Sequence, residues 1–140
     1  MKRLDPTDPE HARALERLIS QLPIWLTTVR EDAQPQSSPV WFLWDGELFH
    51  MLSKPGTPKV RNIGANPRVS LHLQASDDAD EDLLMIEGLA EFEEGHSDGW
   101  LPSYEAKYAH LIEGYGWTPQ SMEADYSVVI KITPTRFRVE

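Results

Sequence analysis

The feature that most constrains the fold of this chain is the pair Asp45-Gly46, which lies between two segments rich in apolar residues. Segments 36–44 and 47–53 on either side have the composition of β-strands. An Asp-Gly pair favours the tight turn of a β-hairpin, because glycine adopts the positive φ angle that such a turn requires. The sequence therefore predicts two antiparallel strands joined at this point.

Further segments predict strands that extend this pair into a sheet. The clearest is 68–75, where Val69, Leu71 and Leu73 alternate with polar residues, so that one face of the strand is buried. Gly88 lies inside another such segment and indicates a β-bulge. The other expected strands are 24–30, 83–92 and 126–133, with a continuation over 136–139 beyond Pro134.

Proline residues mark the starts of short helices. Asp8 followed by Pro9 is typical of a helix N-cap. Thr57-Pro58 predicts a second helix start in the same way. We expect the buried face of the first helix to carry Leu15, Leu18, Ile19 and Leu22, which follow helical spacing. A further helix is expected over about 102–113, and a short capped turn at Thr118-Pro119.

Together these elements predict a mainly β protein with one domain, residues 1–140. Six strands in meander order with short helices between them suggest a closed antiparallel barrel, since closure removes exposed sheet edges. No apolar run approaches the roughly 20 residues that span a bilayer, and the start of the chain lacks the apolar core of a signal peptide. Cysteine is absent. We therefore expect a cytoplasmic protein that does not associate with membranes.

Charge is distributed unevenly along the chain. It has 23 acidic and 13 basic residues, a formal net charge of −10. No Asp or Glu occurs between residues 48 and 76, a window that contains Lys54, Lys59, Arg61 and Arg68. A local positive island attracts an anion, whereas the overall negative charge disfavours nucleic acid. The window predicts a small phosphorylated ligand; a solvated basic turn without a ligand is the alternative.

Within that window, segment 53–59 has the order strand end, glycine and helix start. The N-terminus of a helix offers unpaired backbone N–H donors and the positive end of the helix dipole. Two hydroxyls and two ammonium groups accompany it, from Ser53, Lys54, Thr57 and Lys59. These groups are suited to a phosphate ester, although the segment is not a Walker A loop.

No pattern points to a catalytic side chain or a metal. The histidines show no metal-ligand spacing, and His50 and His72 lie in expected strands, where a structural role is favoured. The acidic run 77–82 lacks the spacing of a calcium-binding EF-hand loop and is expected to be a solvated loop. We predict no metal site and no catalytic acid, base or nucleophile, so that a bound cofactor would supply the chemistry. Trp41 and Trp117 are the tryptophans placed to stack on its flat ring.

Five segments of the chain resemble the pyridoxamine 5′-phosphate oxidase-like split-barrel flavoproteins, most closely the branch assigned to F420-dependent enzymes. They are residues 25–30 (Trp-Leu-Thr-Thr-Val-Arg), 39–42 (Pro-Val-Trp-Phe), 44–46 (Trp-Asp-Gly), 57–63 (Thr-Pro-Lys-Val-Arg-Asn-Ile) and 66–71 (Asn-Pro-Arg-Val-Ser-Leu). The resemblance covers about residues 25–91, and 126–139 looks like the closing strand of that family.

This resemblance implies a six-stranded antiparallel split β-barrel that forms a homodimer, with two flavin or deazaflavin sites at the subunit interface. It implies that the ring lies on the backbone of one strand, at Ser38, Pro39, Val40 and Trp41. It also implies that the phosphate is held by Ser53, Lys54, Thr57 and Lys59, in a loop shaped by Asn62. Trp117 of the second subunit is the candidate that closes the pocket.

The function implied is that of an oxidoreductase that uses FMN or F420 to transfer hydride to or from a small organic substrate. Both cofactors carry a phosphate after a ribityl chain, so the sequence does not distinguish FMN from F420. It also leaves open the substrate and the direction of the reaction. The chain lacks the arginine-rich C-terminal substrate segment of pyridoxamine 5′-phosphate oxidase itself, which argues against oxidation of vitamin B6. Two alternatives stay open: a carrier or storage protein for FMN, F420 or haem, and a structural dimer whose basic loop is incidental.

Overall fold

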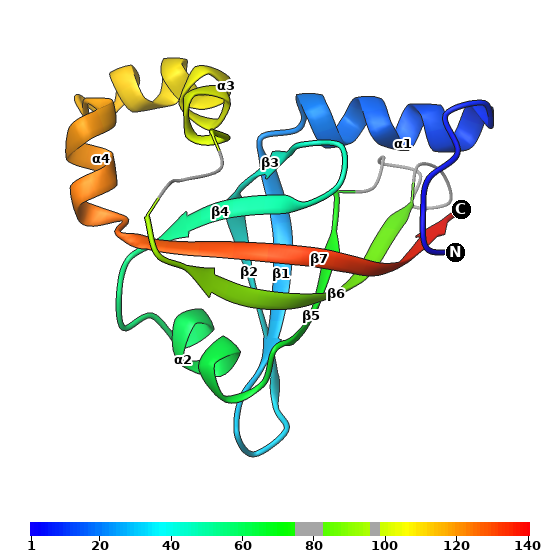
Figure 1. Ribbon diagram of the computed structural model, residues 1–140, viewed down its shortest axis with the longest axis horizontal. Helices are drawn as coiled ribbons and strands as arrows, with labels where there is room; N and C mark the ends of the chain where they lie inside the picture. The colour runs from blue at the N-terminus through cyan, green and yellow to red at the C-terminus, as the bar shows by residue number, and fades with distance from the viewer. Residues whose placement is uncertain (75–82, 96–98) are drawn as a thin grey trace.

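A computed structural model describes residues 1–74, 83–95 and 99–140 of the chain, and Figure 1 shows their arrangement. The strands are β1 (Pro23–Val29), β2 (Pro35–Trp41), β3 (Leu43–Trp44), β4 (Phe49–Ser53), β5 (Arg68–His72), β6 (Leu84–Glu93) and β7 (Val128–Val139). The helices are α1 (Pro9–Ser20), α2 (Pro58–Ala65), α3 (Leu101–Gly114) and α4 (Pro119–Asp125). The predicted acidic loop, residues 77–82, lies outside the described residues.

All strands belong to one antiparallel sheet with the order β2-β1-β5-β6-β7-β4-β3. The predicted meander order is therefore wrong, because β1 pairs with β5, and β4 pairs with β7. The predicted closed barrel is also corrected: the ladder ends at β2 and β3, so the sheet is a curled half-barrel. These two edge strands follow each other in the chain and are separated by Phe42 alone.

Phe42 explains why the described residues form seven strands rather than the predicted six. The expected single strand 36–44 is divided there into β2 and β3. The backbone N–H of Phe42 donates to the Tyr108 hydroxyl at 2.8 Å, and that hydroxyl lies 3.0 Å from the Phe42 carbonyl oxygen. The Tyr108 side chain of α3 thus takes up the backbone N–H and C=O groups of Phe42 that would otherwise continue the strand ladder. The expected strand is therefore interrupted at Phe42.

Two clusters of buried side chains form the core. The first fills the inside of the curled sheet under α1 and includes Leu18, Ile24, Phe49, Leu71 and Ile130. The second lies between the sheet and the helices α3 and α4, and includes Leu52, Trp100, Tyr104, Tyr108, Ile112, Met122 and Val129. In Figure 1, α1 lies over one end of the sheet and α3 and α4 lie at the other.

The start of α1 is as predicted, but its buried face is not. The Asp8 carboxylate accepts hydrogen bonds from the backbone N–H groups of Glu10 (2.9 Å) and His11 (3.4 Å). His11, Ala14 and Leu18 form the buried stripe, whereas Ile19 and Leu22 of the predicted face are 67% and 39% exposed. The helix ends at Ser20, so Leu22 lies beyond it, and Ile19 lies outside the stripe that contacts the sheet.

Two predicted glycine positions are confirmed. At the hairpin turn Gly46 has φ +98°, and the Asp45 carboxylate accepts from the N–H groups of Glu47 (2.8 Å) and Leu48 (2.7 Å). At Gly88 the register between β6 and β7 shifts, which is the expected bulge. A Cβ atom at Gly88 would lie only 2.8 Å from the Ile132 side chain, so the strands approach too closely there for any other residue.

Other boundaries differ from expectation by small amounts. The last strand begins at Val128 and runs without a break through Pro134 to Val139. The predicted turn at Thr118 is the helix α4, which Thr118 and Ser121 cap with a reciprocal pair of hydrogen bonds. Among the helices of the described residues, none has the length and apolar character needed to cross a bilayer.

Candidate functional site

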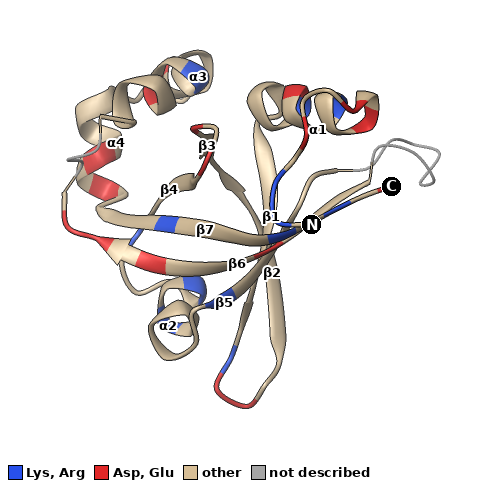
Figure 2. Cartoon of the chain, turned by 45° about the vertical axis from the view of Figure 1, so that its right-hand side comes forward, with Lys and Arg blue, Asp and Glu red and all other residues tan. Residues whose placement is uncertain are grey.

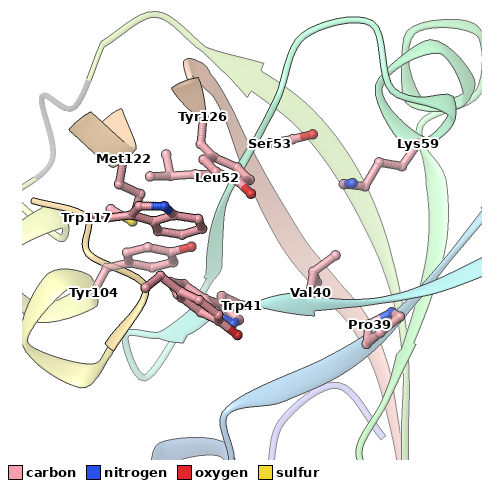
Figure 3. Close-up of a pocket in the computed structure, with 11 residues that line it drawn as sticks. Pro39, Val40, Trp41, Leu52, Ser53, Lys59, Tyr104, Trp117, Met122 and Tyr126 are labelled. Atoms are coloured by element: carbon pink, nitrogen blue, oxygen red, sulfur yellow. The ribbon is translucent and has the colours of Figure 1, made fainter. Parts of the chain in front are cut away.

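A pocket of about 350 Å³ opens between the edge strand β2, the end of β4, the start of α2 and the pair α3–α4 (Figure 3). This volume falls in the range of small-molecule sites, roughly 300–1,000 Å³. Its lining residues are Pro39, Val40, Trp41, Leu52, Ser53, Lys59, Tyr104, Tyr115, Trp117, Met122 and Tyr126. Figure 3 shows that Ser53 and Lys59 lie on one side of the hollow and most of the aromatic rings on the other. We call these sides the polar end and the aromatic end.

The polar end is formed where β4 stops and α2 begins. Ser53 is 1% exposed, and its hydroxyl donates to the Lys54 carbonyl oxygen (2.9 Å) and lies 3.1 Å from the Thr57 hydroxyl. Thr57 is the N-cap residue of α2 but makes no side-chain capping bond. The first N–H groups of α2 are therefore not capped by Thr57, which leaves donors for an anion at this helix end.

Lys59 is the cation of this pocket. Its side chain is half-buried, and burial lowers the pKa of its ammonium group. Within the described part of the chain no carboxylate forms an ion pair with it. A half-buried ammonium without a counter-ion is stabilised by any anion that enters the pocket. The polar end therefore fits a phosphate group.

Two other predicted residues support this end from outside the lining. Asn62 is buried and donates to the Thr28 hydroxyl and to the Gln36 side-chain oxygen, both at 2.9 Å, which fixes α2 against β1 and β2. Lys54 is exposed, with its ammonium nitrogen 5.4 Å from the centre of the Tyr126 ring. Asn62 thus positions the loop rather than facing the pocket, and Lys54 lies at its margin.

The predicted segment of β2 forms the side wall of the pocket. Pro39, Val40 and Trp41 line the pocket, whereas Ser38 does not. The Trp41 ring stacks on the Tyr108 ring, with 4.5 Å between centroids and an angle of 4° between planes. The Tyr108 hydroxyl accepts a hydrogen bond from the Phe42 N–H group, which holds the Tyr108 ring in place. The Trp41 ring that stacks on it is therefore fixed between the strand edge and α3.

The aromatic end comes almost entirely from α3, α4 and the chain between them. Tyr115 and Trp117 lie 4.9 Å apart by ring centroids, and Trp117 and Tyr126 lie 5.9 Å apart. Tyr104 is buried beside them, and burial raises the pKa of its phenol well above the ordinary value. Sequence reasoning identified Trp117 alone in this group; its ring lines the same pocket as Ser53 and Lys59 of its own chain.

The tyrosines were missed because their signal is ambiguous. Tyr104 and Tyr108 are one helical turn apart and could be predicted to share a face of α3. Nothing in the sequence says that this face lies over β2 and β4.

Charge also differs between the two ends: Figure 2 shows basic residues on α2 and acidic residues on α4.

The two histidines considered as candidate ligands lie away from the pocket lining. His50 is 1% exposed; its Nε2 atom lies 2.7 Å from an Asp45 carboxylate oxygen, and its ring stacks on Trp100 at 4.9 Å. His72 stacks on Trp25, with ring centroids 6.1 Å apart. These contacts are consistent with the structural role predicted for both residues.

Comparison with known proteins gives a consistent result over most of the chain. A family model described as pyridoxamine 5′-phosphate oxidase matches residues 8–139. A crystal structure from Listeria innocua, provisionally named a pyridoxamine 5′-phosphate oxidase, is 27% identical with a TM-score of 0.71, and the match covers 94% of this chain and 98% of that one. No significant match is found among curated proteins.

Two further solved structures are similar to the chain. One named F420 reductase is 32% identical with a TM-score of 0.63, covering 88% of this chain and 94% of that chain. The haem storage protein HutZ from Vibrio cholerae is 20% identical with a TM-score of 0.71, covering 98% of this chain and 94% of that chain. The likeness to HutZ is one of fold alone.

Proposed function

Because the chain belongs to the pyridoxamine 5′-phosphate oxidase family, we propose that it is an oxidoreductase that uses FMN or F420 to transfer hydride to or from a small organic substrate. The observation that carries this proposal is the polar end of the pocket. There Lys59, half-buried and without a carboxylate partner among the described residues, lies beside Ser53 and the uncapped start of α2. The identity of 32% to an F420 reductase favours the deazaflavin.

The residues of the pocket fit the parts of such a cofactor. Ser53 and Lys59 would hold the phosphate together with Thr57, whose hydroxyl lies beside that of Ser53 outside the pocket lining, while Lys54 lies at the margin and Asn62 fixes α2 from behind. The backbone of β2 from Pro39 to Trp41, with Ser38 just outside the lining, would lie along the ring system, and Trp117 would close the pocket on the opposite side. The cofactor, when bound, supplies the ring atoms that accept or release hydride.

The protein would then act by binding, orientation and exclusion of water. Val40, Leu52 and Met122 contribute apolar surface to the pocket, which favours a water-poor site. Trp41 is held rigidly by its stacking on Tyr108, so the wall along β2 is preorganised. The chain supplies a fixed geometry rather than a nucleophile or a tuned histidine.

The pocket favours a flavin or deazaflavin over haem. Imidazole is a common axial ligand of haem iron, and no histidine is present among the described residues that line the pocket. A role in cofactor carriage without turnover remains the alternative function. Tight cofactor binding combined with no reaction with any acceptor would favour it.

We also propose that the active unit is a two-fold dimer. Several large apolar side chains of the described residues are exposed, including Leu89 (42%), Phe92 (43%) and Tyr115 (61%), and a second copy could cover them. Light scattering of the cofactor-loaded protein should give about twice 16.0 kDa. A monomer that binds one cofactor per chain tightly would contradict this assembly.

The function is tested by titrating the purified protein with FMN and with F420. Binding is followed by absorbance and by the quenching of tryptophan fluorescence, since Trp41 and Trp117 line the pocket. Reduced cofactor should then be reoxidised by an organic acceptor faster with the protein than without it. Failure of both cofactors to bind would refute the proposal.

A further inference from the structure

A second hollow, of about 580 Å³, shares no lining residue with the pocket described above. It lies among residues 2–4, the helix α1, the hairpin turn 44–48 and the second half of β7. Its volume is in the range of small-molecule sites. Figure 1 shows the start of the chain beside the end of β7, with α1 above them. The proposed cofactor site does not account for this cavity.

Hydrogen bonds hold both walls of the second hollow. The Phe137 N–H group donates to the Met1 carbonyl oxygen at 2.6 Å, which ties the start of the chain to β7. The Asp5 N–H group donates to Nδ1 of His11 at 2.8 Å, which ties the same segment to α1. On the other side, the Asp45 carboxylate fixes the hairpin turn by accepting two backbone N–H groups. The cavity is therefore formed before any ligand enters it.

The floor of the second hollow is apolar. The Trp44 and Phe137 rings meet edge to face there, with 6.1 Å between centroids and an angle of 80° between planes. Phe137 is buried, whereas Trp44 is only partly buried. Leu4, Leu15 and Leu48 add aliphatic surface that is also partly buried. Covering such a surface with a hydrocarbon chain is favourable, because it removes apolar area from water on both sides.

The rim of the second hollow carries an excess of positive charge. Lys2 and Arg3 line it, and among the described residues neither forms an ion pair with a carboxylate. Glu47 is the acidic residue of the described lining. The nearby Asp45 carboxylate is taken up by the turn and by Nε2 of His50. Two cations against one carboxylate attract an anionic head group.

We propose that the second hollow binds an amphiphilic carboxylate, an aliphatic chain that ends in one carboxylate group. The chain lies on the floor formed by Leu15, Trp44 and Phe137, and the carboxylate lies between Lys2 and Arg3. This site is independent of the proposed function, since the two cavities share no residue. The net charge of −10 repels a carboxylate, so a preference for it has to come from the two rim cations.

The test compares three probes that share a ten-carbon chain: decanoate, decan-1-ol and decyltrimethylammonium. Binding to the full chain without an affinity tag is measured by equilibrium dialysis at pH 7, below the micelle concentration of each probe. Decanoate should bind about three- to tenfold more tightly than decan-1-ol, the range expected for two exposed ion pairs. Decyltrimethylammonium should bind more weakly than decanoate, although the overall charge of the protein favours the cation.

Charge variants test the rim. Lys2→Gln and Arg3→Gln should each weaken decanoate binding by about two- to fivefold. The double variant should bind decanoate no more tightly than decan-1-ol. Arg68→Gln is the matched control, because Arg68 is exposed and lies outside the lining of both cavities, and it should leave decanoate binding unchanged.

Two further variants identify which cavity is occupied. Leu15→Trp fills part of the second hollow and should weaken decanoate and decan-1-ol alike. Lys59→Ala removes the cation of the cofactor pocket and should leave decanoate binding unchanged. The circular dichroism spectrum of each variant is compared with that of the wild-type protein before dialysis.

Three results would overturn this site. They are decanoate binding no tighter than decan-1-ol in the wild-type protein, unchanged decanoate binding in the double variant of Lys2 and Arg3, and loss of decanoate binding in Lys59→Ala. None of these measurements requires a cofactor. Failure of FMN and F420 to bind would therefore refute the proposed function and leave the second site to be decided by its own titrations.

Discussion

The polar and aromatic ends of the pocket are built in opposite ways. The polar end comes from residues 53–62, one stretch in which a strand ends and a helix begins. The aromatic end joins Trp41 to side chains of residues 104–126, more than sixty positions away in the chain. An anion site can be encoded locally, because a helix start and its neighbouring cation are sequence neighbours. A wall of rings depends on which distant elements pack together.

The two ends also differ in what holds them in place. Hydrogen bonds fix the polar end: Asn62 ties α2 to β1 and β2, and Ser53 pairs with Thr57. Stacked rings and a single buried hydroxyl fix the aromatic end, through Trp41 and Tyr108. Substitutions at the two ends should therefore change different quantities, ligand affinity at the polar end and stability at the aromatic end.

The largest effect is expected at the polar end. Lys59→Ala should weaken cofactor binding by about 1.5–3 kcal/mol, the usual contribution of a charge-assisted hydrogen bond. The fold should be unaffected, since Lys59 lies in the first turn of α2 and is not part of either buried cluster. Calorimetric titration measures the loss.

Lys54→Ala is the matched control, because Lys54 is exposed and outside the pocket lining. It should have a smaller effect than Lys59→Ala. Unchanged affinity both in Lys59→Ala and in the double variant of Lys54 and Lys59 would show that the polar end is not the phosphate site.

At the aromatic end, Tyr108→Phe should reduce the free energy of unfolding by about 1–3 kcal/mol, the cost of leaving a buried donor without a partner. The substitution removes the acceptor of the Phe42 N–H group, and Phe42 is fully buried. Urea denaturation followed by fluorescence measures it. A loss of less than about 0.5 kcal/mol would mean that the split at Phe42 does not depend on this hydroxyl.

A smaller effect is expected for the histidines, which belong to neither end. His50→Ala and His72→Ala should change the rate of cofactor reoxidation well short of the roughly 10²–10⁴-fold loss that follows removal of a general acid or base. His50 is buried against Trp100, so each rate is compared with the fraction folded. A variant that loses turnover but keeps its fold and its cofactor affinity would reveal an acid–base role.

The smallest effect concerns Lys107, whose ammonium donates to the Phe42 carbonyl oxygen at 3.0 Å and lies 3.7 Å from the Phe42 ring centre. Burial lowers the pKa of Lys107 to about 8 from its ordinary value of 10.5. Between these values the unfolded chain binds more protons than the folded one, so the contribution of Lys107 to stability rises with pH. Relative to Lys107→Met, the wild-type protein should gain stability from pH 7.5 to 9.5 in urea denaturation. If the difference in stability between the wild-type protein and Lys107→Met stayed constant or fell over this pH range, a buried ammonium beside Phe42 would be contradicted.

Local signals predicted the individual elements well. Asp8, Asp45-Gly46 and Gly88 fixed a helix start, a turn and a bulge, because each depends on hydrogen bonds or φ angles within a few residues. The order of the strands was predicted wrongly, since the Asp45-Gly46 turn predicts only the pairing of the two strands on either side of it. Family resemblance, rather than periodicity, predicted a split barrel, with six strands instead of the seven observed among the described residues.

The sequence by itself therefore determined the local order of the polar end: an acid-free window and a strand–glycine–helix order place Ser53, Thr57 and Lys59 close together in the chain. Only the tertiary structure decided that α3 and α4 pack over β2 and β4 and bring Tyr104, Tyr115 and Tyr126 to the same pocket. The reason is physical. Donors at a helix start are set by the local backbone, whereas ring contacts depend on packing between elements far apart in the chain, which neither spacing nor composition encodes.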